Sequence, residues 1–189
     1  MLDNFSIDTD YANLYDPTVG LVCGMKVSGY FSAVCEKPDG GIRWKVDRFN
    51  GVSNEGFNLM LDSMFRSASI TTFSLWYIGL ISNSGYTTGI VAGDTMASHG
   101  GWTEDSTHYT ASVRPTWTPS AAATKSITNG TPVSFAMNTD NTIIKGIFVA
   151  TDDTLGGTAG KLWASGLFGS DQTLFNMDTL KITYTVSLS

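Results

Sequence analysis

The stretch with the greatest potential for chemistry is GDTMASHGGWTE, at residues 93–104. It places His99, one of two histidines in the chain, next to Ser98 and between the carboxylates Asp94 and Glu104. Histidine with serine and an acid is the composition of a hydrolytic triad, and histidine with acids can bind zinc. The segment is therefore either a catalytic or metal-binding loop, or a structural loop of similar composition.

The spacing of these residues does not favour catalysis or metal binding. Ser98 and His99 are adjacent, so on a strand they would point to opposite faces, whereas a triad joins them through space. The chain has no Gly-x-Ser-x-Gly motif. A zinc site needs three or four ligands, but His99 and His108 lie nine residues apart with no cysteine near them in sequence. A carboxylate pair of the glycosidase kind stays open, because any two acids can meet in a fold.

A structural role accounts for more of the segment. Asp94 and Thr95 can accept hydrogen bonds from nearby backbone amides and start a tight turn or a single helical turn. Gly100 and Gly101 would permit a reversal with positive φ. Trp102 would be a large buried plate with one N–H to satisfy, and the histidine would hold the loop by hydrogen bonds. We therefore predict a protein that is not an enzyme and has no catalytic residue, metal or cofactor. The predicted structural loop contains Asp94, Thr95, His99, Trp102 and Glu104.

The composition indicates one folded domain. The chain has 189 residues, of which 42% are hydrophobic, so it can bury a sizeable core. Only 15% are charged, well below the usual quarter, so Ser, Thr, Asn and Gly must form much of the surface. A weakly charged surface rich in hydroxyl groups is common in proteins that pack into assemblies.

Charge and hydropathy argue against two classes of partner. The net charge is −6 and the 11 Lys and Arg residues are scattered, whereas a nucleic-acid surface needs them clustered. The longest apolar run, residues 73–81, is too short to span a bilayer. The N-terminus lacks the basic and apolar regions of a secretory signal. We therefore expect Cys23 and Cys35 to be reduced, although the two could form one bridge.

Residues 1–23 predict an N-terminal arm. They show no sustained hydrophobic period, but they carry Phe5, Tyr11 and Tyr15 among Asp, Asn and Thr. This is too aromatic for a plain disordered tail, so we expect an extended arm that docks on a partner. The alternative is a frayed terminus.

Residues 24–189 predict a β domain. Apolar residues alternate over residues 25–35, and alternation resumes at 42–46 after the turn sequence Pro-Asp-Gly-Gly, which indicates a hairpin. The clearest alternation covers residues 180–188. Further strands are expected at residues 73–81, 108–114, 133–137, 143–150 and 161–168. Short strands with Gly, Asn and Asp between them and one helix predict a mainly β fold, a β-sandwich or jelly-roll-like domain.

The one predicted helix follows Ser53 or Asn54, either of which can cap it. Its apolar residues recur with helical spacing, which predicts that this stripe packs on a sheet and faces a core. The stripe consists of Phe57, Met60, Leu61 and Met64.

The order of several segments resembles that of a group of tailed-bacteriophage virion proteins. These segments are NGVSNEGFN at 50–58, WYIGL at 76–80, DTMASHGGWTE at 94–104, RPTW at 114–117 and ITN at 127–129. The resemblance covers roughly residues 45–188, and residues 94–104 are its most specific part. It implies a small β-rich structural protein, such as a head decoration (cement) protein, and it supplies no catalytic residues. The arm lies outside it.

The expected function is that of a capsid decoration protein on the virion surface, made in the host cytoplasm. Its expected partners are the major capsid protein and further copies of itself, as a homo-oligomer with a trimer preferred over a dimer. Direct contact with nucleic acid or membrane is not expected. A tail or fibre-attachment protein of the same particle is the alternative. A third candidate is a carbohydrate-binding or hydrolytic β-sandwich that stacks sugars on Trp102 or Trp117.

Overall fold

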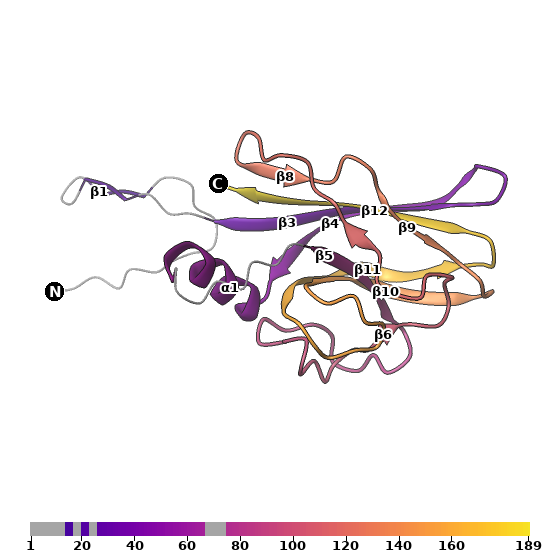
Figure 1. The fold of residues 1–189 in the computed structure, drawn as a ribbon. Coiled ribbons are helices and arrows are strands. Elements are labelled where there is room, and N and C mark those ends of the chain that lie inside the picture. Colours follow the sequence, from indigo (N-terminus) through magenta and orange to yellow (C-terminus); the bar gives the residue numbers. More distant parts are fainter. Residues whose placement is uncertain (1–13, 17–19, 23–25, 67–74) are drawn as a thin grey trace.

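The computed structural model describes residues 14–16, 20–22, 26–66 and 75–189 (Figure 1). Strands β1 (Leu14–Asp16) and β2 (Gly20–Val22) pair antiparallel in a sheet of their own. The part of the predicted arm that is described is thus a small hairpin, with Tyr15 in β1. Phe5 and Tyr11 lie outside the described residues.

The other strands form one curled antiparallel sheet that folds into two facing layers (Figure 1). One layer contains β3, β8, β9 and β12, and the other contains β5, β6, β7, β10 and β11. The predicted mainly β, sandwich-like class is confirmed. The strands are β3 (Val27–Glu36), β4 (Ile42–Val52), β5 (Trp76–Ser82), β6 (Glu104–Asp105), β7 (Thr116–Trp117), β8 (Ser126–Thr128), β9 (Val133–Ala136), β10 (Thr142–Ala150), β11 (Leu162–Leu174) and β12 (Thr179–Leu188).

Strand β4 joins the two layers. Along most of its length it pairs with β3, from Ile42 opposite Glu36 to Asn50 opposite Gly29. Its last two residues instead pair with Ser165 and Ala164 of β11. This change of neighbour carries the sheet from one layer into the other.

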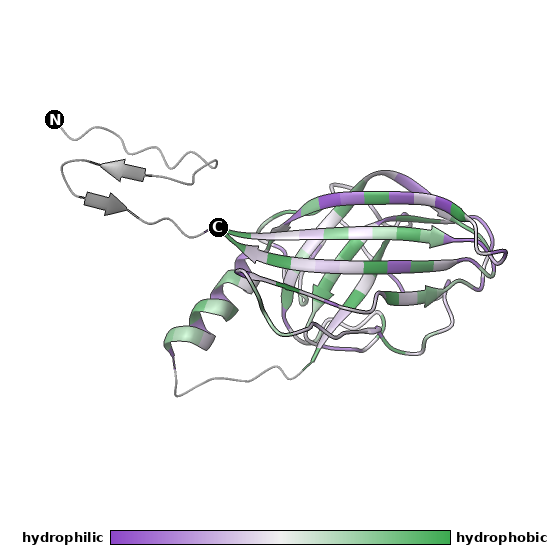
Figure 2. Ribbon diagram, turned by 90° about the horizontal axis from the view of Figure 1, so that it is seen from above, coloured by the Kyte–Doolittle hydropathy of each residue, from purple (hydrophilic) through white to green (hydrophobic). Residues whose placement is uncertain are grey.

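The main core fills the space between the layers. The alternation of residues 25–35 is realised in β3, where Phe31, Ala33 and Cys35 are fully buried. Strand β12 pairs with β3 along its whole length and contributes Ile182 and Tyr184 to the same core. In Figure 2 apolar and polar residues alternate along these long strands. The period-two pattern in the sequence thus identifies the inner face.

The strand predicted at residues 108–114 does not form. Only Tyr109 makes an isolated bridge, to Met137. The Asp105 carboxylate accepts hydrogen bonds from the backbone N–H groups of Thr107 and His108, both at 3.2 Å. These contacts fold the chain into a turn where an extended strand was expected.

Helix α1 (Asn54–Phe65) is capped as predicted, because the Ser53 hydroxyl accepts a hydrogen bond from the Gly56 N–H at 2.9 Å. Ser53 also fixes the start of the helix on β11, since its backbone N–H donates to the Trp163 carbonyl at 2.9 Å. Gly56 allows this close approach: a Cβ there would lie 2.4 Å from the Trp163 carbonyl oxygen. Within the described ranges, α1 is not long and apolar enough to cross a membrane.

The prediction that the apolar stripe of this helix faces a core is wrong. None of its four residues is buried, and Leu61 and Met64 are 49% and 60% exposed. Phe65, at the end of the helix, is 74% exposed. Hydrogen bonds of Ser53, Asn54 and Glu55 join the start of the helix to the domain. Its later turns project from the domain beside the C-terminus (Figure 2). Helical periodicity identified an apolar face but not what covers it.

Cys35 is a free, buried cysteine whose Sγ donates to the Asp178 carboxylate at 3.5 Å. Burial raises the pKa of the thiol to about 12, and the nearby negative charge of Asp178 acts in the same direction. Cys23 lies outside the described residues.

We expect the Cys35 thiol of the folded protein to be inert at neutral pH, because only the thiolate attacks disulfide reagents. A Cys23→Ser variant should give no reaction with dithiobis(nitrobenzoate) when folded and one thiol per chain in denaturant. Fast reaction of this folded variant would contradict the assignment. The wild-type chain should titrate two thiols in denaturant without reductant, and none would indicate a disulfide.

Candidate functional site

Residues 93–103 belong to the long loop between β5 and β6, and Glu104 is the first residue of β6. Met96 and Trp102 are each 1% exposed and form a second apolar cluster with Ile81, Phe148 and Leu162. The loop reverses at Thr95 and Ser98, whose backbones exchange two hydrogen bonds of 2.9 and 3.1 Å. Of the two predicted alternatives, the tight turn is therefore the one formed.

Asp94 is the polar centre of this loop. Its Oδ2 accepts the Trp102 indole N–H at 2.9 Å and the Val91 backbone N–H at 3.0 Å. The indole is thus buried with its one donor satisfied, and the carboxylate is buried with two donors. Both groups are used to hold the loop on the sheet.

His99 lies flat on Trp102, with ring centroids 3.9 Å apart and planes inclined by 20°. Its Nδ1 is 3.0 Å from the Trp102 carbonyl oxygen. Because a carbonyl oxygen only accepts, this Nδ1 carries the hydrogen and donates it. The imidazole therefore closes the turn around the tryptophan.

The expected role of the two glycines is wrong. Neither Gly100 nor Gly101 has a positive φ. Gly101 instead allows close packing, because a Cβ there would lie 2.3 Å from the Gly89 carbonyl oxygen. The prediction that glycine is needed here holds for Gly101, but the reason is the lack of space for a side chain and not a positive φ.

Glu104, the last residue of the predicted loop, forms a buried ion pair that the sequence analysis missed. The Arg114 guanidinium donates to both Glu104 oxygens, each at 2.8 Å, and the side chains are 0% and 4% exposed. Arg114 also donates to the Asp152 and Gly157 carbonyls at 2.8 Å. One available signal was that Arg114 is the only Lys or Arg between Arg66 and Lys125. The pair ties β6 to two loops, the one that contains Arg114 and the one that contains Asp152 and Gly157.

The second histidine is also paired with an acid. His108 Nδ1 lies 2.8 Å from Oδ2 of Asp105, whose side chain is 1% exposed. The pair lines a shallow hollow of about 190 Å³ together with Asp140 and Asn141. A histidine oriented by a carboxylate can serve as a general base. Here Asp105 also accepts two backbone N–H groups, so it forms a turn as well.

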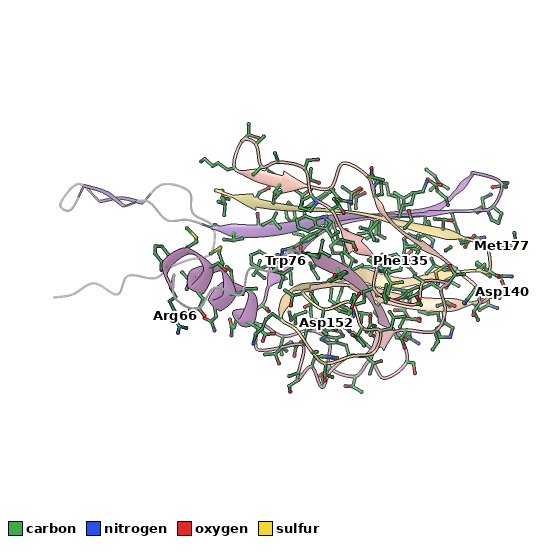
Figure 3. The ribbon with its side chains drawn as sticks, viewed as in Figure 1. Arg66, Trp76, Phe135, Asp140, Asp152 and Met177 are labelled. Carbon is green, nitrogen blue, oxygen red and sulfur yellow. The ribbon has the colours of Figure 1, made fainter. Side chains whose placement is uncertain are left out.

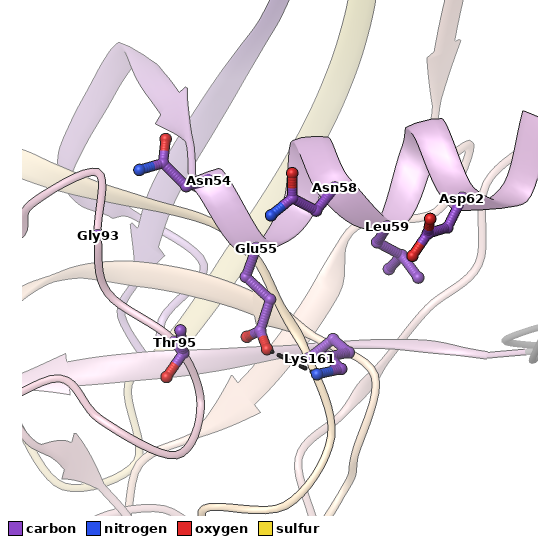
Figure 4. Close-up of a pocket in the computed structure, with 8 residues that line it drawn as sticks. All are labelled: Asn54, Glu55, Asn58, Leu59, Asp62, Gly93, Thr95 and Lys161. Atoms are coloured by element: carbon purple, nitrogen blue, oxygen red, sulfur yellow. Dashed lines mark hydrogen bonds and ion pairs between the residues drawn. The ribbon is translucent and has the colours of Figure 1, made fainter.

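A polar groove of about 320 Å³ separates α1 from the loop (Figure 4). Glu55 spans it: one oxygen pairs with Lys161 at 3.0 Å, and the other accepts the Leu162 N–H at 2.8 Å and the Met96 N–H at 3.2 Å. The helix start, the loop and β11 are thus joined through one carboxylate. In the parts of the chain that the structure describes, no three His, Cys, Asp or Glu residues are grouped as a metal site.

An apolar pocket of about 250 Å³ lies between the layers, at the end of the domain where β12 finishes. Its walls are Trp76, Trp117 and Trp163 with Pro119, Ile127, Val149 and Val186.

The third candidate, a β-sandwich that stacks sugars on Trp102 or Trp117, would need these rings to be exposed, and the structure buries both. Trp102 is 1% and Trp117 6% exposed. The Trp117 indole N–H is bound inside the protein by the Asn129 side chain at 3.0 Å and the Tyr184 carbonyl at 3.2 Å. The Trp102 ring is enclosed in the second apolar cluster, and the Trp117 ring forms part of the pocket wall, so neither is an exposed surface for stacking a sugar.

Comparison with known proteins identifies no family. No protein-family model matches the chain, and no curated protein matches its sequence. The resemblance to phage virion proteins therefore stays a prediction from the residues.

We expect His99→Ala to lower the free energy of unfolding by about 1 kcal/mol, the usual scale for a lost hydrogen bond. The loss should arise from the contact with Trp102 and should not depend on any metal. Urea denaturation and elemental analysis of both proteins test this. Zinc bound at one ion per chain, and lost in the variant, would contradict a purely structural loop.

Proposed function

We propose that this chain is a non-enzymatic structural protein of a tailed-phage particle, and that it decorates the head by binding the major capsid protein. The proposal starts from the resemblance carried by residues 94–104 and the other matching segments. In the structure, the groups of this segment with potential for chemistry make internal contacts: Asp94 binds the Trp102 indole, His99 closes the turn and Glu104 pairs with Arg114. Such use supports a structural role.

The observation that carries the proposal is the apolar end of the domain. Leu61, Met64 and Phe65 are exposed on a helix that leaves the body of the protein. Exposed apolar side chains gathered in one place are typical of a protein-contact surface. They occur in a chain with few charges, which suits packing within an assembly.

The arm would supply the contact with the shell. Lys26 lies at the end of the domain from which the helix projects. There its backbone exchanges hydrogen bonds of 2.8 and 3.0 Å with that of Ser189 at the C-terminus. The start of the described domain therefore lies beside the C-terminus, at the end from which the helix projects. We propose that Phe5, Tyr11 and Tyr15 dock on coat subunits, while the domain contacts neighbouring copies.

Co-sedimentation with undecorated capsids tests this proposal. Binding should persist in 1 M NaCl, where the Debye length is about 3 Å, because apolar burial and not charge pairing would sustain it. Protein that stays in the supernatant at both low and high salt would contradict a head location. Binding to isolated tails instead would support the tail alternative.

A further inference from the structure

Two apolar features lie at the same end of the domain. One is the helix end, formed by Leu61, Met64 and Phe65, and the other is the tryptophan pocket. The start of the helix is fixed on the pocket wall, because the Ser53 backbone N–H donates to the carbonyl of Trp163, which lines the pocket. In Figure 3 Trp76, which lines the pocket, is labelled at the same end of the domain as Arg66, which follows the helix.

The pocket suits an apolar guest of the size of one aromatic side chain. Its volume of about 250 Å³ exceeds the roughly 150 Å³ that holds a benzene ring in an engineered protein cavity. Two of its indole N–H groups already have acceptors inside the protein. Trp163 Nε1 donates to the Tyr184 hydroxyl at 3.1 Å, and Trp117 Nε1 donates to the Asn129 side chain at 3.0 Å. The wall therefore presents mainly carbon.

The helix end can be buried without isolating a charge. The basic residue next to it, Arg66, is paired with Asp62 at 3.1 Å on the same helix. If Arg66 and Asp62 remain paired and partly hydrated, the contact avoids the desolvation penalty of a lone buried charge. Met64 and Phe65 could thus enter an apolar pocket while this pair stays at its rim.

We propose that the tryptophan pocket receives the helix end of a second copy of this chain. Twelve helical residues span about 18 Å, so α1 reaches well beyond its own first turn and away from its own pocket wall. Because each copy carries both the projecting side chains and the pocket at one end, contacts made around a symmetry axis at that end would satisfy both. The inference rests on the proposed assembly role and names the surface that it uses.

Self-association of the purified chain tests the inference without any particle, so its failure is distinct from failure of the capsid proposal. A Met64→Asp, Phe65→Asp variant should weaken association at least tenfold in sedimentation equilibrium while its melting temperature stays unchanged. The matched control is Met177→Asp: Met177 is 68% exposed and lies at the opposite end of the domain (Figure 3). Its association should equal that of the wild type.

Site-directed cross-linking gives a second readout that does not depend on weakening the contact. In a Cys23→Ser background, a Phe65→Cys chain mixed with an Ile127→Cys chain should form a heterodimer with a short bis-maleimide. Mixing Met177→Cys with Ile127→Cys should not.

Three results would overturn the inference. The first is a monomeric wild-type chain at about 0.1 mM, roughly a hundredfold above a dissociation constant of about 1 μM. The second is cross-linking that is equal in both mixtures. The third is loss of association on deleting residues 1–13. The last would assign the pocket to the arm.

Discussion

Replacing Arg114 by alanine is expected to lower the free energy of unfolding by about 3–5 kcal/mol, the scale for removing one partner of a buried ion pair. The Glu104 side chain is only 4% exposed, so the substitution would leave its carboxylate buried without a cation. The carbonyls of Asp152 and Gly157 would also lose their hydrogen-bond donor. Arg114→Lys should recover only part of the loss, because an ammonium cannot reproduce the two-pronged contact. Urea denaturation measures the change.

The matched control for this prediction is Arg66→Ala. Arg66 is also paired with an acid, but its side chain is 66% exposed. Exposed pairs contribute little, so unfolding should change by less than about 1 kcal/mol. Equal losses at the two arginines would contradict the view that Arg114 holds the loops in place.

Deleting residues 1–23 is expected to abolish capsid binding and leave thermal unfolding nearly unchanged. The ten-stranded sheet starts at Val27, and every residue of the described core lies after that point. A Phe5→Ala, Tyr11→Ala, Tyr15→Ala variant should reproduce the binding loss without shortening the chain. Co-sedimentation and melting curves provide the two readouts. A truncated chain that fails to fold would show that the arm belongs to the core.

The strands with regular alternation were predictable because successive side chains of a strand point to opposite faces of the sheet. Residues 180–188 identified β12, and residues 25–35 identified β3, including the burial of Phe31 and Cys35. The turn at Asp94 was predictable for a similar reason, since a short carboxylate binds amides close to it in sequence. These contacts are local or periodic.

The contacts that could not be predicted join residues far apart in the chain. Glu104 binds Arg114 but also the Gly156 N–H at 2.6 Å, 52 positions later. No local pattern marks such a partner. The failure at α1 has the same origin: Met64 has the spacing of a core residue, yet its exposure depends on the angle at which Ser53 fixes the helix to β11. The turn at Asp105 likewise overrode the strand pattern of residues 108–114.

We propose that this chain is a component of a phage shell, and its copy number in purified particles tests this proposal most directly. Quantitative mass spectrometry against the major capsid protein should find on the order of hundreds of copies per particle, as expected for a protein that repeats with the symmetry of a lattice. About a dozen copies or fewer would contradict a head decoration role and favour the tail. A chain absent from the virion would contradict the structural assignment altogether.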